Sequence, residues 1–88
     1  MRIWVKLFKD THLLKDTTVE DYGQDTRTKK VFNALDAACK EFDLGVPIWL
    51  KSNIEDFQLH SKVRFDADSF IEPIDFDYME FHVIEEDF

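Results

Sequence analysis

The sequence has 88 residues, of which 44% are hydrophobic, and its 19 Asp and Glu against 11 Lys and Arg give a formal net charge of −8. This length predicts one domain, with a single core that closes without a metal ion or a disulfide. The acidic balance argues against nucleic acid and anionic lipid as direct partners, because like charges repel.

The first predicted element is a strand over residues 3–8, where β-branched and aromatic side chains alternate between two faces. Asp10 and Thr11 supply the chemistry of a tight turn. The Thr and Val content of residues 13–20 predicts a second, more polar strand at the edge of a sheet. Residues 2–20 are therefore expected to form a hairpin.

A long helix is predicted over residues 26–42, because apolar side chains recur at helical spacing from residue 31 to residue 42. Asp25 or Thr26 is expected to cap its N-terminus. Gly45 suits the left-handed conformation that often ends a helix.

The segment VPIWL, residues 46–50, is predicted either as a short edge strand or as an extended connector, because the apolar run contains a proline near its start. Ser52 and Glu55 have the spacing of a capping box. This start signal and the apolar residues behind it predict a second, shorter helix over about residues 53–64.

The last predicted strand covers residues 74–84, and its apolar face switches partway along. Large apolar side chains occupy even positions from residue 74 to residue 78 and odd positions from residue 79 to residue 83. Either a bulge near residues 78–80 changes the register, or the second half is covered on both sides, with one side meeting another chain.

Together these elements predict one α+β domain over residues 1–88, in the order β-β-α-(β)-α-β. A small antiparallel sheet, made of the N-terminal hairpin and the C-terminal strand, is expected to be covered by two helices. The strand over residues 3–8 is apolar on both sides, so we place it centrally with the C-terminal strand beside it.

The charge is unevenly distributed, because residues 65–88 hold nine acidic and no basic side chains, whereas residues 1–64 hold 10 acidic and 11 basic ones. Such acids favour solubility and protect a strand against aggregation. The functional alternative is an acidic face that steers a protein with a basic surface to it. Same-side strand residues repeat at about 6.5–7 Å, so such a face would also imitate a row of nucleic-acid phosphates. The candidate partner-binding residues are Asp66, Asp68, Glu72, Asp75, Asp77, Glu85, Glu86 and Asp87.

Three cations crowd the first turns of the long predicted helix, where the helix dipole disfavours positive charge. They are Arg27, Lys29 and Lys30. Either the acidic C-terminal region of the same chain folds against them, or an external anion such as phosphate binds at this helix N-terminus.

Metal binding and catalysis have little support in the sequence. Asp66, Asp68 and Glu72 are weak candidate ligands for a divalent cation, but the pattern of an EF-hand loop is absent. The three histidines show no zinc-ligand spacing. Cys39 lies on the apolar stripe of the long helix and is expected to fill the core. No catalytic motif occurs, so we expect a non-enzymatic protein without a cofactor or a metal.

The compartment is predicted from the single cysteine, which excludes an intramolecular disulfide and favours a reducing, cytoplasmic setting. The apolar stretch near the N-terminus is short and is interrupted by Lys6, so we expect neither a signal peptide nor a membrane span.

Three segments are similar to small uncharacterised proteins of Gram-positive bacteria: DTRT at residues 25–28, IWL at 48–50 and IDFDY at 74–78. The resemblance covers most of the chain. It implies a bacterial cytoplasmic origin and a place on a mobile element, and it implies no activity, cofactor or catalytic residue.

The leading functional hypothesis is a non-enzymatic protein-binding module, an inhibitor or adaptor of a basic, nucleic-acid-handling protein, which acts through the acidic C-terminal face. The first alternative is a homodimer in which Met79, Phe81 and Val83 of the last strand pack across a twofold axis. The second is a small anion-binding regulator at the N-terminus of the long helix.

Overall fold

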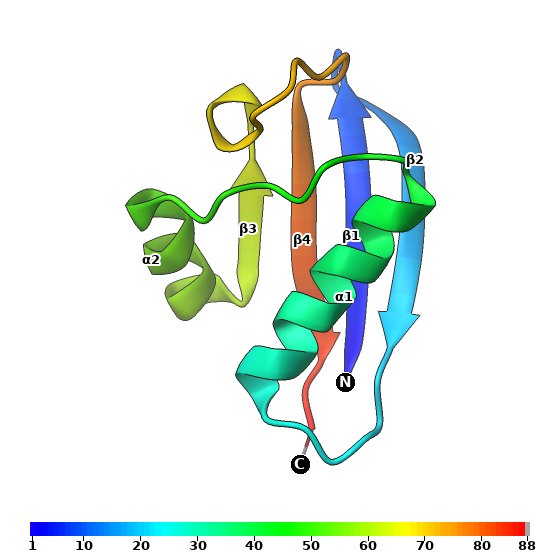
Figure 1. Cartoon of the computed structure of the whole chain (residues 1–88), viewed down its shortest axis with the longest axis vertical. Coiled ribbons are helices and arrows are strands. Elements are labelled where there is room, and N and C mark those ends of the chain that lie inside the picture. The colour runs from blue at the N-terminus through cyan, green and yellow to red at the C-terminus, as the bar shows by residue number, and fades with distance from the viewer. Residues whose placement is uncertain (88) are drawn as a thin grey trace.

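The computed structural model describes residues 1–87 and confirms the α+β class (Figure 1). Four antiparallel strands form one sheet in the order β2-β1-β4-β3, and two helices lie on one face of it. The elements are β1 (Arg2–Lys9), β2 (His12–Glu20), α1 (Arg27–Glu41), α2 (Lys51–His60), β3 (Lys62–Phe65), the 3-10 turn η1 (Ala67–Ser69) and β4 (Tyr78–Glu85).

The predicted N-terminal hairpin is confirmed, with β1 paired to β2. Asp10 and Thr11 form its two-residue turn with φ angles of 52° and 66°, the left-handed conformation that such turns require at both positions. Leu14 is an extra residue in the ladder, because Leu7 faces Lys15 and Phe8 faces Leu13. This bulge interrupts the exposed edge of the sheet and so protects it against pairing with another chain.

The core lies between the sheet and the helices. Alternate residues of β1, namely Ile3, Val5 and Leu7, point into it and are at most 4% exposed. They face Val83, Phe81 and Met79 of β4 in the antiparallel register. This pairing brings the two ends of the sequence together at the centre of the sheet, as the sequence predicted.

The last strand is shorter than predicted, since it begins at Tyr78 and residues 74–77 belong to the preceding loop. This boundary explains why the apolar positions change parity: Ile74 and Phe76 pack on the core from a loop, not from the strand. The bulge in β4 lies at Ile84, which is unpaired between the contacts of Arg2 with Glu85 and Ile3 with Val83. Neither a bulge near residues 78–80 nor a second chain is needed.

The position of β4 contradicts the hypothesis of a homodimer that packs through this strand. Both edges of β4 are paired, one with β1 and the other with β3. Met79, Phe81 and Val83 are buried under the helices within the monomer. They are therefore not available for packing across a twofold axis.

The second helix ends earlier than predicted, because residues 62–65 form a strand. Ser61 adopts the left-handed conformation with a φ of 52° and turns the chain into β3. Val63 and Phe65 are buried while Lys62 and Arg64 between them are exposed, which is the period of a strand. Residues 46–50 form the extended connector and not a strand.

The caps of the helices differ partly from the sequence prediction. Thr26 caps α1 as expected, since its hydroxyl accepts a hydrogen bond from the backbone N–H of Lys29. The left-handed residue after α1 is Asp43, with a φ of 57°, and not Gly45. At α2 the side chain of Asn53 accepts from the N–H of Leu50 at 2.9 Å, in place of the expected Ser52 and Glu55 pair.

In residues 1–87 no helix combines the length and the hydropathy needed to cross a bilayer.

Candidate partner-binding surface

The acidic residues that the sequence places together lie at two ends of β4. Glu85, Glu86 and Asp87 are at its C-terminal end, whereas the acids from Asp66 to Asp77 precede it (Figure 1). An eight-residue strand separates the two groups by about 25 Å. The prediction of one continuous acidic face is therefore wrong, and so is the imitation of a phosphate row, because Asp66, Asp68, Glu72, Asp75 and Asp77 lie in loops and a 3-10 turn.

The C-terminal acids are bound by cations of the same chain. Glu86 accepts two hydrogen bonds from the guanidinium of Arg27, at 2.7 and 3.1 Å. Asp87 forms ion pairs with the ammonium of Lys30 and with the amine of Met1. The hydrogen bonds from Lys30 and from that amine hold the pKa of Asp87 below its ordinary value. These two carboxylates have a structural role, so the prediction that Glu86 and Asp87 bind a partner is wrong.

Glu85 is held more loosely, at 3.8 Å from Arg2. Both side chains are more than 40% exposed, so this contact contributes little.

The same contacts decide between the two predictions for the N-terminus of α1. Lys30 is only 3% exposed and directs its ammonium at Asp87, while Arg27 is paired with Glu86. Lys29 is 66% exposed and lies 3.8 Å from Asp25. Internal compensation by the C-terminal acids is thus confirmed. The alternative prediction, that an external anion compensates these cations, is wrong, because Glu86 and Asp87 of the chain itself do so.

The remaining acids gather at the other end of the sheet, where the β1–β2 turn, the end of α1 and the β3–β4 loop meet. We call this surface the acidic loop end; its residues are Asp10, Asp43, Asp66, Asp68, Glu72, Asp75 and Asp77. All are exposed. Within residues 1–87 none of their carboxylates lies within 4.0 Å of a Lys, Arg or His nitrogen.

Hydrogen bonds fix the loops that carry these acids. Asp66 accepts from the backbone N–H of Asp68 at 3.0 Å and so caps η1. Asp77 accepts from the N–H of Asp10 at 2.8 Å, which ties the β3–β4 loop to the β1–β2 turn. The buried hydroxyl of Ser69 donates to Asn53 of α2. The carboxylates are therefore presented from an ordered backbone.

A groove of about 360 Å³ lies within the acidic loop end, between the end of α1 and the β3–β4 loop. Apolar side chains line most of it, and Asp43 and Glu72 lie among them. Ile71 is 85% exposed and Val46 47%, so the groove offers apolar surface next to unpaired negative charge. Sequence reasoning missed Asp43 and Ile71, because the turn and loop that carry them are far apart in the sequence.

The predicted weak cation ligands do not form a site. In the part of the chain that the structure describes, no group of three or more His, Cys, Asp or Glu side chains is placed to hold a metal ion. Asp66, Asp68 and Glu72 therefore do not converge.

Cys39 is buried at 1% exposure on the core side of α1. Burial, helped by the charge of Asp36, raises the pKa of its thiol to about 11. The thiol is thus protonated at neutral pH and unsuited to act as a nucleophile.

Comparison with protein-family models, curated proteins and solved structures finds no match for this chain. The resemblance to small Gram-positive proteins stays a prediction.

Proposed function

We propose that this chain is a non-enzymatic binding module for a protein with a basic, partly apolar surface, which it engages through the acidic loop end. One observation supports this most: four exposed carboxylates have no cationic partner in the described residues, namely Asp66, Asp68, Glu72 and Asp75. Of these, Glu72 lines a groove together with the exposed Ile71. The C-terminal acids, by contrast, are paired.

The two kinds of surface have different roles in binding. Unpaired carboxylates of one sign create a directional field, which attracts a basic partner over a distance and accelerates encounter. Ile71 and the apolar groove then supply the buried contact that holds the complex. Association should accordingly weaken as the ionic strength rises.

The single buried thiol is consistent with a reducing compartment, so we propose that the module acts in the cytoplasm.

The test is affinity capture at low salt, with identification and quantification of the captured proteins. The loop-end variant carries Asp66→Asn, Asp68→Asn, Glu72→Gln and Asp75→Asn. A matched control changes the net charge equally at exposed acids elsewhere: Glu20→Gln, Asp25→Asn, Glu55→Gln and Asp56→Asn. We expect the loop-end variant to capture at least tenfold less of a basic protein than the wild type does. The control should capture as much of it as the wild type.

An additional variant, Ile71→Ser, separates the apolar contribution from the charge. It should weaken capture without altering the dependence on salt. Equal capture by the wild type, the loop-end variant and the control would contradict the proposed function.

A further inference from the structure

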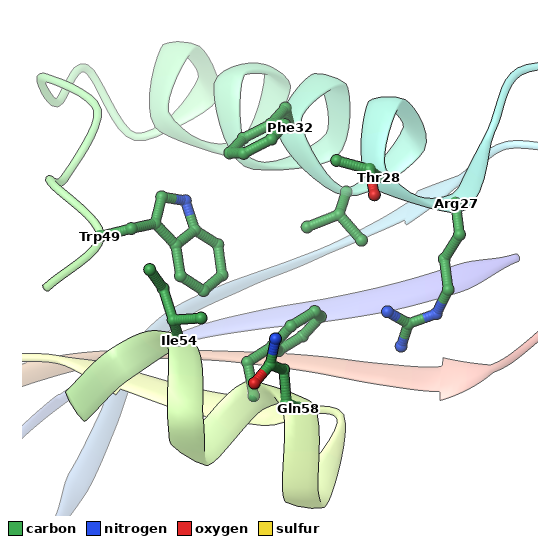
Figure 2. Close-up of a pocket in the computed structure, with 8 residues that line it drawn as sticks. Arg27, Thr28, Phe32, Trp49, Ile54 and Gln58 are labelled. Atoms are coloured by element: carbon green, nitrogen blue, oxygen red, sulfur yellow. The ribbon is translucent and has the colours of Figure 1, made fainter. Parts of the chain in front are cut away.

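The two helices cover different parts of the sheet and leave a groove between them. α1 packs on β1 and β2, whereas α2 packs on β3. The space between them measures about 300 Å³, which is at the lower end of the range for small-molecule sites. We call it the α1–α2 groove; the residues that line it include Arg27, Thr28, Phe32, Trp49, Ile54 and Phe57 (Figure 2).

One end of this groove is apolar and is formed before any ligand arrives. Phe32 of α1 and Ile54 of α2 are 52% and 43% exposed, and Trp49 of the connector lies between them (Figure 2). The indole ring of Trp49 packs edge-on against Phe57 and Phe65, with ring centroids 5.4 and 4.9 Å apart. An apolar body placed here would remove exposed hydrocarbon from water without rearranging the walls.

The other end of the groove is polar and carries a cation. Figure 2 shows Arg27 and Thr28 at the end away from Trp49 and Ile54. The guanidinium of Arg27 lies 5.2 Å from the ring centre of Phe57, which limits its movement.

Arg27 has donor capacity left. Its Nε and Nη2 donate to Glu86, and Nη2 also lies 3.3 Å from the hydroxyl of Ser61. A guanidinium has five N–H groups, and the two on Nη1 have no acceptor among residues 1–87. A second carboxylate can therefore bind Arg27 without displacing Glu86.

From this polarity we propose that the α1–α2 groove binds a small amphiphile with a single carboxylate on a compact apolar chain or ring. The carboxylate binds Arg27, and the apolar body lies between Phe32 and Ile54 against Trp49. Because Glu86 already balances the charge of Arg27, the selection of an anionic over a cationic head group depends on the two N–H groups of Nη1, which can donate to a carboxylate but not to an ammonium group. The small volume excludes large ligands.

The fluorescence of Trp49 provides a direct test, once Trp4 on the opposite face of the sheet is replaced by Phe. This Trp4→Phe protein is titrated with decanoate, 4-phenylbutyrate and decyltrimethylammonium, each below its micellar concentration. We expect a saturable change with a carboxylate and at least tenfold weaker binding of the ammonium compound. Binding of decanoate alone supports a fatty acid as the ligand class, and binding of 4-phenylbutyrate alone supports an aromatic acid.

Variants then locate the site. Arg27→Gln should weaken carboxylate binding about tenfold and abolish the preference for an anionic head group. Ile54→Gln should weaken the binding of every ligand. Leu59→Gln is the matched control, since Leu59 is 77% exposed on the same helix and does not line the groove.

Three results would overturn the proposal: no saturable change with either carboxylate, equal binding of the ammonium compound, or a loss with Leu59→Gln as large as with Ile54→Gln. The proposal would also be overturned if a captured partner protein protected Trp49 from acrylamide quenching and the small acids did not. The groove would then be a site for a helix of that partner. The acidic loop end plays no part in this test, so its outcome is independent of the proposed function.

Discussion

Glu80 is a charged residue buried on the face of the sheet that neither helix covers. Its side chain lies 2.8 Å from the ammonium of Lys6 on β1 and 3.4 Å from the guanidinium of Arg64 on β3. Burial by itself raises the pKa of Glu80, but the hydrogen bonds and charges of Lys6 and Arg64 outweigh it and hold that pKa below the ordinary value. The carboxylate therefore joins three neighbouring strands.

The Glu80→Gln variant should be less stable than the wild type by about 1–2 kcal/mol at pH 7, because it loses the charge that Lys6 and Arg64 share. Since the pKa of Glu80 is depressed on folding, its contribution is complete above the unfolded carboxyl pKa of about 4.3 and is lost as the pH falls through the lower folded value. Urea unfolding of both proteins at pH 7 and at pH 3 measures this. A difference in stability between wild type and variant that is larger at pH 3 than at pH 7 would contradict this role of Glu80.

At the scale of elements, the C-terminal segment after β4 stabilises the N-terminus of α1. Arg27 and Lys30 stand where the helix dipole disfavours cations, and Glu86 and Asp87 supply the compensating charge. The hydrogen bonds that Arg27 donates to Glu86 also raise the pKa of Arg27. Two elements that are far apart in sequence are thereby joined.

Asp87→Asn should lower the melting temperature, because the buried ammonium of Lys30 then loses its carboxylate partner. The pKa of Asp87 is lowered on folding, so the stability that its carboxylate contributes should be present above about pH 4 and should fade as the pH falls further. Glu85→Gln is the matched control, since its contact with Arg2 is long and exposed. Thermal unfolding at pH 7 should show a clear loss for the first variant and almost none for the second; equal losses would exclude a specific role of Asp87.

Local signals predicted some elements well. The hairpin and α1 were predictable, because turn residues and helical spacing act over a few neighbouring positions. The boundary between α2 and β3 was not, because Val63 and Phe65 extend the apolar pattern of the helix and the left-handed Ser61 gives no signal in sequence. Residues 74–77 likewise have the alternation of a strand but pack on the core as a loop.

At the scale of the whole molecule, the fold divides the acids of the C-terminal quarter into a paired group and an unpaired group. Sequence alone indicated the excess of negative charge but not its division, because both groups border the same strand. The acidic loop end also includes Asp10 and Asp43, which reach it from the N-terminal half through the sheet topology. Such a surface depends on contacts between distant segments.

Thermal unfolding of the loop-end variant at low salt tests most directly that the acidic loop end is free for a partner and not required by the fold. Because the substitutions remove like-charge repulsion and no ion pair, we predict a melting temperature equal to or above that of the wild type. Any increase of the melting temperature over that of the wild type should disappear in high salt. A loss of stability as large as that of Asp87→Asn would contradict the prediction, since it would show that these carboxylates, too, hold the molecule together.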